Sequence, residues 1–178
     1  NDLAKHVIFG LRQIQKTGPL NVIGWSLGGC LIQLMLQNNP DDLGKVVLVN
    51  TAHSFNADLF EKTIDLRKEL ENEEDYLQAV FEVKKGAVEL ISAGCSYKVL
   101  NEYYDALTQF RGFSNENKSK NKCLIVYGKK DIVINGHDTE ELAACFLDGR
   151  VEAYDSQGHF LPLIAPLPFN SAIQSFLR

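Results

Sequence analysis

The segment Gly24-Trp25-Ser26-Leu27-Gly28 constrains the fold more than any other stretch of the sequence. The residues before it, Leu20-Asn21-Val22-Ile23, read as a short strand, and an apolar helix follows over 30–38. A turn this tight between strand and helix strains the backbone at the serine, and small residues two positions before and after avoid clashes. We therefore expect the Ser26 hydroxyl to project from the carboxyl edge of a sheet. The alternative is a glycine-rich turn with an idle serine.

Strands and helices alternate on both sides of a long helical stretch. The expected elements around the turn are a helix over 2–16 and strands over 20–23 and 45–50. Further along are a strand over 123–127, a helix over 138–147 opened by an Asp138…Glu141 capping box, a strand over 151–154 and a helix over 170–177. Apolar strands that alternate with helices predict an α/β fold with a parallel sheet. Residues 55–117 show helical periodicity and predict a helical lid inserted into a core formed by 1–54 and 118–178.

A serine hydroxyl needs a base to take its proton before it becomes a useful nucleophile. The sequence has four histidines, and only His159 and His53 follow strands at the carboxyl edge; His6 lies on the first helix and His137 in a polar loop. His159, in Gln157-Gly158-His159-Phe160, is the predicted base. His53 is the competitor, and we expect it to line the substrate pocket.

The acid that orients the histidine should also follow a strand. Asp131 comes directly after the strand over 123–127, in Tyr127-Gly128-Lys129-Lys130-Asp131. Asp155 also follows a strand, but its position four residues before His159 favours a turn. No acid follows the strand over 45–50, which ends in Asn50-Thr51-Ala52. The predicted catalytic set is therefore Ser26, Asp131 and His159, with the Leu27 N–H donating to an oxyanion at the helix N-terminus.

Together these residues resemble the α/β-hydrolase superfamily, matched from the helix before Gly24–Gly29 to the C-terminal helix. Within it, Leu20–Gly29 is similar to the elbow of the pimeloyl-[acyl-carrier-protein] methyl ester esterases of biotin synthesis. The resemblance implies a serine carboxylic-ester hydrolase that forms an acyl-enzyme and needs no metal or organic cofactor. It also implies the methyl ester of a carrier-bound acyl chain as a candidate substrate.

In this superfamily several strands precede the elbow, and the loop after the third supplies a second oxyanion donor. No such segment stands before Asn1. We expect the sequence to be a fragment rather than a shortened protein whose first strand has an open edge.

The amino-acid composition restricts the classes of binding partner and the cellular compartment that we expect. The net charge is −5 and no block of Lys or Arg occurs, so nucleic acids and anionic membranes are poor partners. No apolar run is long enough for a membrane span, so we expect a soluble protein. The four cysteines lack the spacing of a zinc site or a disulfide framework, which favours reduced, buried thiols in a cytoplasmic protein. The sequence does not define the oligomeric state.

The sequence of the predicted lid does not identify the substrate. Nine of the seventeen aromatic residues fall in 55–113, which indicates either a small helical core or an apolar channel for an acyl chain beside Trp25. The same stretch holds twelve acids and seven bases, a poor match for an acidic carrier protein, although Lys84-Lys85 and Arg67-Lys68 could form local patches. Thioester, lactone or C–C bond hydrolysis, acyl transfer, and a catalytically dead binding module remain alternatives.

Overall fold

The computed structural model of the chain describes residues 2–15, 17–38, 40–54, 107, 109–113, 118–131, 133–134 and 136–178. These residues contain a four-stranded sheet in the order β1-β2-β3-β4, in which every neighbouring pair is parallel. The strands are β1 (Leu20–Trp25), β2 (Leu43–Val49), β3 (Ser119–Gly128) and β4 (Phe146–Tyr154). The predicted α/β fold with a parallel sheet is confirmed.

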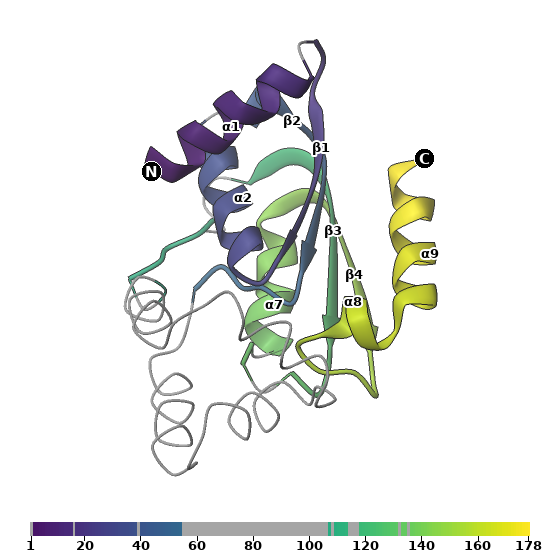
Figure 1. The fold of residues 1–178 in the computed structure, drawn as a ribbon. Helices are drawn as coiled ribbons and strands as arrows, with labels where there is room; N and C mark the ends of the chain where they lie inside the picture. The colour runs from purple at the N-terminus through teal and green to yellow at the C-terminus, as the bar shows by residue number, and fades with distance from the viewer. Residues whose placement is uncertain are drawn as a thin grey trace, which may run out of the picture.

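Helices cover both faces of the sheet, because each parallel connection has to cross over one face. In Figure 1 the helices α1, α2 and α7 lie on one side of the sheet, and α8 and α9 on the other. Their bounds are α1 (Asp2–Ile14), α2 (Leu27–Asn38), α7 (Gly136–Ala144), α8 (Leu161–Ile164) and α9 (Pro166–Leu177), with a short 3-10 turn η1 (Pro40–Asp42) before β2.

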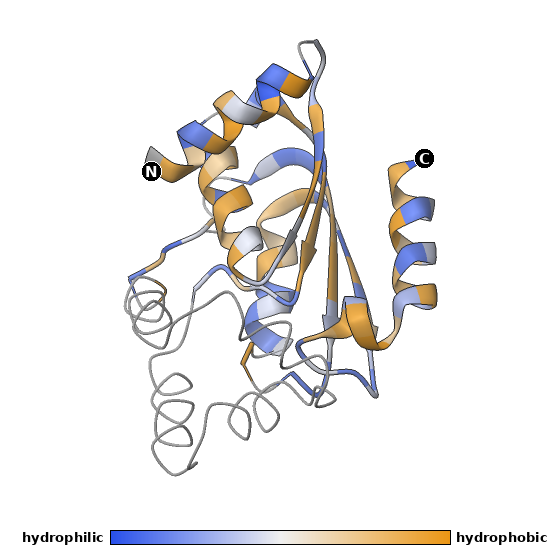
Figure 2. Ribbon diagram, viewed as in Figure 1, coloured by the Kyte–Doolittle hydropathy of each residue, from blue (hydrophilic) through white to orange (hydrophobic). Residues whose placement is uncertain are grey.

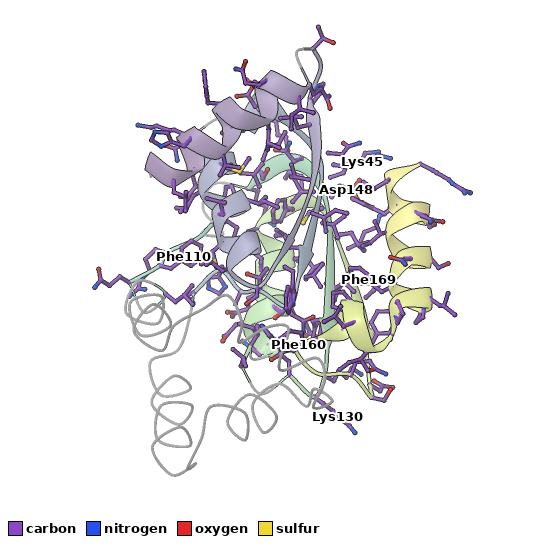
Figure 3. All side chains as sticks on the ribbon, in the orientation of Figure 1. Lys45, Phe110, Lys130, Asp148, Phe160 and Phe169 are labelled. Carbon is purple, nitrogen blue, oxygen red and sulfur yellow. The ribbon has the colours of Figure 1, made fainter. Side chains whose placement is uncertain are left out.

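Successive side chains of β2 point to opposite faces of the sheet and pack into two apolar layers, one on each face. Val46 and Leu48 pack with residues of α1, α2 and α7, whereas Val47 and Val49 pack with residues of α8 and α9. Figure 2 shows long hydrophobic stretches in the central strands. Lys45, at the start of this run, donates from Nζ to the carbonyl oxygens of Phe176 and Leu177 at the end of α9, 2.9 and 3.1 Å away (Figure 3). The second halves of β2 and β3 are therefore buried on both faces, whereas the edge strands β1 and β4 are partly exposed.

Several expected element bounds were wrong. The helix expected over 138–147 begins at Gly136 and ends at Ala144, so Asp138 lies in its first turn instead of capping it. The strand expected over 151–154 begins at Phe146, which pairs with Ser119. Its first half, Leu147-Asp148-Gly149-Arg150, holds a single apolar side chain, Leu147, and is mostly exposed at the sheet edge, so it lacks the apolar signal of a buried strand.

The C-terminal region also departs from expectation. The closing helix expected over 170–177 begins at Pro166, because proline fits the first turn of a helix. The short helix α8, which holds the buried Leu161, was not predicted.

The two ends of the predicted lid lie side by side on α2. Ser54 and Arg111 form an antiparallel bridge, and the Gly112 N–H donates to the His53 carbonyl at 2.7 Å. Gln33 of α2 is completely buried; its Nε2 donates to the Ala52 carbonyl at 3.0 Å, and its Oε1 accepts from the Phe113 N–H at 3.4 Å. Of the lid predicted over 55–117, residues 55–106, 108 and 114–117 lie outside the described residues, so the domain boundaries stay a prediction.

Three of the four cysteines fall within the described residues. Cys30, Cys123 and Cys145 are free and buried, as predicted. Burial raises the pKa of the Cys30 thiol to about 12, which keeps it protonated and inert at neutral pH. Among the described helices, none has both the length and the apolar character that crossing a membrane requires.

Candidate active site

Ser26 occupies the sharp turn between β1 and α2 in a left-handed conformation, with φ of 52°. Its N–H donates to the Val49 carbonyl at 2.8 Å, and its own carbonyl accepts from the Gly29 N–H at 2.9 Å. These bonds hold a non-glycine residue in a conformation that L-amino acids rarely adopt. The strain expected at this serine is therefore present.

The glycines around Ser26 have different roles. A Cβ at Gly24 would lie 2.5 Å from the Gly28 carbonyl oxygen, and one at Gly29 would lie 2.4 Å from the Thr51 side chain. A Cβ at Gly28 would meet nothing within 4 Å. The expectation that Gly28 avoids a clash was wrong, because the close approaches fall on Gly24 and Gly29.

The loops after β3 and β4 bring Asp131 and His159 to Ser26. His159 Nε2 lies 3.0 Å from Ser26 Oγ, and His159 Nδ1 lies 2.8 Å from Asp131 Oδ2. Both side chains are buried, with 4% of His159 and 1% of Asp131 exposed. This geometry lets the imidazole accept the serine proton at Nε2 while the carboxylate fixes its Nδ1–H tautomer.

The other carboxylate oxygen of Asp131 is also occupied. Its Oδ1 accepts hydrogen bonds from the backbone N–H groups of Val133 and Ile134, at 2.8 and 2.9 Å. The alternative acid, Asp155, instead pairs with Lys129 on the surface at 2.6 Å. Of the two candidate acids, the structure therefore brings Asp131 to the histidine.

Asn50, the first residue after β2, is a site residue that the sequence analysis missed. It is completely buried, its φ is 45°, and its N–H donates to the Val126 carbonyl at 2.9 Å. Its side-chain Nδ2 donates to Asp131 Oδ2 at 2.7 Å. The signal in the sequence is an amide directly after an apolar strand, at the edge of the sheet where an acid was expected.

Trp25 contacts the loop that carries His159. Its Nε1 donates to the His159 carbonyl at 2.9 Å, and its ring centroid lies 5.6 Å from that of His159 and 4.8 Å from that of Phe160. Trp25 and Leu27 are 38% and 40% exposed, so they offer apolar surface beside Ser26. Leu27 begins α2, and its N–H is one of the first-turn donors that lack an intrahelical acceptor.

His53 lies against the start of α7. Its Nδ1 is 3.4 Å from the Asp138 carbonyl oxygen, and its Nε2 is 3.9 Å from Glu141 Oε2. Its predicted place in a substrate pocket stays a prediction.

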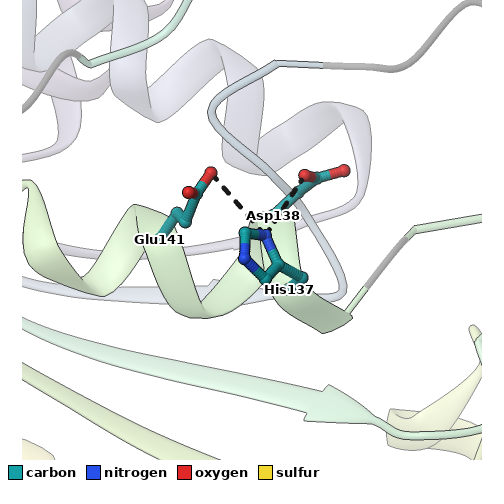
Figure 4. A group of neighbouring side chains, drawn as sticks. All are labelled: His137, Asp138 and Glu141. Carbon is teal, nitrogen blue, oxygen red and sulfur yellow. Dashed lines mark ion pairs between the residues drawn. The ribbon is translucent and has the colours of Figure 1, made fainter.

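One group of side chains has the composition of a metal site. His137, Asp138 and Glu141 offer ligand atoms within 4.8 Å of one another on the first turns of α7 (Figure 4). His137 and Glu141 are exposed and form an ion pair with 3.9 Å between Nδ1 and Oε2. An (i, i+4) pair at the start of a helix accounts for this arrangement, and we assign no metal to it.

Comparison with known proteins decides the family. The family model described as Thioesterase domain matches residues 1–156. The chain belongs to the thioesterase domain family. This is an α/β-hydrolase family, so the chain is a hydrolase. The matched range of the thioesterase model includes Ser26 and Asp131 and ends before His159, which the structure supplies.

Solved structures show the same fold. A thermophilic esterase has a TM-score of 0.79 at 22% identity, with 99% of this chain and 71% of that chain covered. A hydrolase from Pseudomonas aeruginosa PA01 has a TM-score of 0.77 at 21% identity, covering 98% and 70%. An esterase from Exiguobacterium antarcticum has a TM-score of 0.75 at 18% identity, covering 95% and 70%. A search of curated protein sequences gives no match.

Proposed function

We propose that this thioesterase-family hydrolase cleaves carboxylic esters through an acyl-enzyme on Ser26. The hydrogen-bonded series from Ser26 Oγ through His159 to Asp131 carries the proposal. The strained backbone at the serine and the buried histidine–carboxylate pair each cost free energy on folding. The stability of the fold therefore does not explain their presence. Catalysis explains why both are present.

In the proposed reaction Ser26 Oγ attacks the ester carbonyl while His159 Nε2 takes the hydroxyl proton. The Leu27 N–H donates to the oxyanion that forms on the former carbonyl oxygen. His159 then gives the proton to the leaving alcohol, and the C–O bond of the ester breaks. Water, deprotonated by the same nitrogen, hydrolyses the acyl-enzyme and restores the serine.

The acyl side of the substrate is proposed to lie against the exposed apolar surface of Trp25 and Leu27. His53, at the root of the predicted lid, is proposed to line the alcohol or acyl pocket. The finer proposal, a methyl ester on a carrier-bound acyl chain, rests on the similarity of Leu20–Gly29 to the esterases of biotin synthesis.

A second candidate is thioester hydrolysis, which the family match favours. The same acyl-enzyme would form, but a thiolate leaves more easily than an alkoxide and depends less on protonation by His159. The proposed ester and thioester activities therefore respond differently to changes at the histidine.

The experiment compares a butyrate oxygen ester with the thioester of the same acid on the intact chain. We expect turnover of at least one substrate, with Ser26→Ala lowering kcat by about 10³-fold or more. A higher kcat/KM for the thioester than for the oxygen ester would identify the protein as a thioesterase. One result would contradict catalysis and favour a binding module. In it, the folded parent chain and its Ser26→Ala variant both bind butyrate, and the parent turns over neither substrate.

A further inference from the structure

Asn50 joins the ends of β2, β3 and β4, three of the four strand ends at the site. It follows β2, its Nδ2 donates to Asp131 Oδ2 after β3 at 2.7 Å, and the same Nδ2 lies 3.4 Å from the Gly158 carbonyl in the loop after β4. Its own N–H is tied to Val126 of β3. We propose that Asn50 is a positioning residue that holds the Asp131 carboxylate and sets the pH at which His159 loses its proton.

The orientation of the Asn50 amide is dictated by its partners. Both the Asp131 carboxylate and the Gly158 carbonyl are acceptors, so only the NH₂ group can face them. This orientation leaves Asn50 Oδ1 buried without a hydrogen-bond partner in the part of the chain that the structure describes. A buried acceptor without a partner destabilises the folded state. The side-chain amide therefore has a cost at Oδ1, and what it provides in return is the donor to Asp131.

The backbone at Asn50 limits which residues could stand there. Its φ of 45° lies in the left-handed region, which asparagine and glycine adopt more readily than other residues. A left-handed turn at this point directs the side chain to Asp131, and glycine would keep the turn without the amide. Glycine is thus the substitution that isolates the side chain from the backbone.

Asp131 Oδ2 is shared between Asn50 Nδ2 at 2.7 Å and His159 Nδ1 at 2.8 Å. A donor to a carboxylate stabilises its negative charge and weakens it as a partner for an imidazolium. Removing the Asn50 amide leaves the full charge of Asp131 to His159, so the histidine should hold its proton to a higher pH.

Among the described residues of the loops after β2, β3 and β4, the charged or titratable side chains other than Asp131 and His159 are paired with other groups or exposed. Lys129 is paired with Asp155, and Lys130 is exposed in the loop after β3. His53, on the loop after β2, faces Glu141 of α7. Ser26, in the turn before α2, and Leu27, the first residue of α2, carry no charge. Within the described part of the chain, the carboxylate of Asp131 is therefore the group whose charge the Asn50 amide modulates at His159.

This inference rests on the proposed function for its meaning, but its test does not need turnover. Trp25 is the only tryptophan in the sequence, and its ring centroid lies 5.6 Å from that of His159. A protonated imidazole quenches indole fluorescence at contact, so emission against pH reports the titration of His159. The His159→Gln variant should abolish that titration and thereby confirms which group is observed.

The experiment compares Asn50→Gly with the intact chain, after circular dichroism confirms folding. We expect the fluorescence midpoint to rise by about half to one pH unit. Where turnover is measurable, the midpoint pH of the acidic limb of the kcat/KM profile should rise by the same amount. The value of kcat should fall, and KM should stay unchanged. Asn38→Gly is the matched control: Asn38 ends α2, its amide bonds to the Leu34 carbonyl, and neither measure should move.

A folded Asn50→Gly variant with an unchanged or lower midpoint would overturn the proposal. A second measurement on the unmodified chain needs no variant: the side-chain amide protons of Asn50, followed by NMR, should shift with the same midpoint as the His159 ring. An Asn50 amide that does not respond to that titration would also overturn it. Absent turnover with a shifted midpoint would instead count against the proposed function alone.

Discussion

The indole Nε1 of Trp25 donates a 2.9 Å hydrogen bond to the backbone carbonyl of His159. The residue before the proposed nucleophile therefore holds the loop that carries the proposed base. Because β1 and the loop after β4 are 134 residues apart in sequence, this bond fixes the distance between two elements that no local connection sets.

Replacing Trp25 with phenylalanine tests that bond while leaving an aromatic ring to pack on Phe160. One neutral hydrogen bond contributes about 1 kcal/mol, so we expect kcat to fall by roughly five-fold. Trp25→Ala, which also loses the ring contacts, should fall further. Steady-state kinetics checks both variants, and an unchanged kcat with a raised KM would show that Trp25 acts on the substrate alone.

Glycine is needed at position 24 and not at position 28. Gly24→Ala should lower the free energy of unfolding by about 1–3 kcal/mol, because its Cβ meets the Gly28 carbonyl oxygen. Gly28→Ala has open space and gains helix propensity, so it should leave stability unchanged or raise it by up to about 1 kcal/mol. Urea denaturation compares the two, and equal losses would mean that the close approach at Gly24 is not what sets its cost.

Gln33 should stabilise the two chain segments at the ends of the predicted lid, which it bonds at Ala52 and Phe113. Gln33→Met keeps the volume but leaves the Ala52 carbonyl without its donor, which should cost about 1–3 kcal/mol of unfolding free energy. The control is Gln37→Met on the same helix, whose amide donates to the Gly112 carbonyl from an exposed position and should cost less than about 0.5 kcal/mol. Thermal denaturation distinguishes them, and a Gln33 variant as stable as the control would remove Gln33 from this role.

Stability should fall at alkaline pH through Cys30. Burial raises the pKa of its thiol from 9.0 to about 12, so the folded chain keeps this proton after the unfolded chain has lost it. The contribution is complete below pH 9 and is lost as the pH rises from 9 towards 12, at up to about 1.4 kcal/mol per pH unit. The free energy of unfolding of Cys30→Ala should decline less steeply over pH 9–11 than that of the parent, and parallel slopes would contradict this assignment.

The sequence sufficed for the elements whose signals are local. Ser26 sits in a five-residue pattern between a strand and a helix, and Asp131 and His159 each follow a strand at the same edge. Because parallel strands share one carboxyl edge, residues that follow them meet in space even when far apart in the chain. That rule was enough to bring these three side chains together.

Other features depend on contacts that no local pattern records. Asn50 gains its place from Asp131 and Gly158, which lie 81 and 108 residues further along the chain. Residues 147–150 of β4 pair with β3 through the backbone although they are mostly exposed and lack an apolar run, so hydropathy did not reveal them. Tertiary pairing overrides composition at both places.

The most direct test of the account is the labelling of Ser26 by a fluorophosphonate probe, followed by intact mass. We predict a single adduct on the folded chain, none on Ser26→Ala, and much slower labelling of His159→Gln, because the base activates the serine. A folded chain that takes up no probe, or an adduct that persists in Ser26→Ala, would contradict the claim that Ser26 is an activated nucleophile.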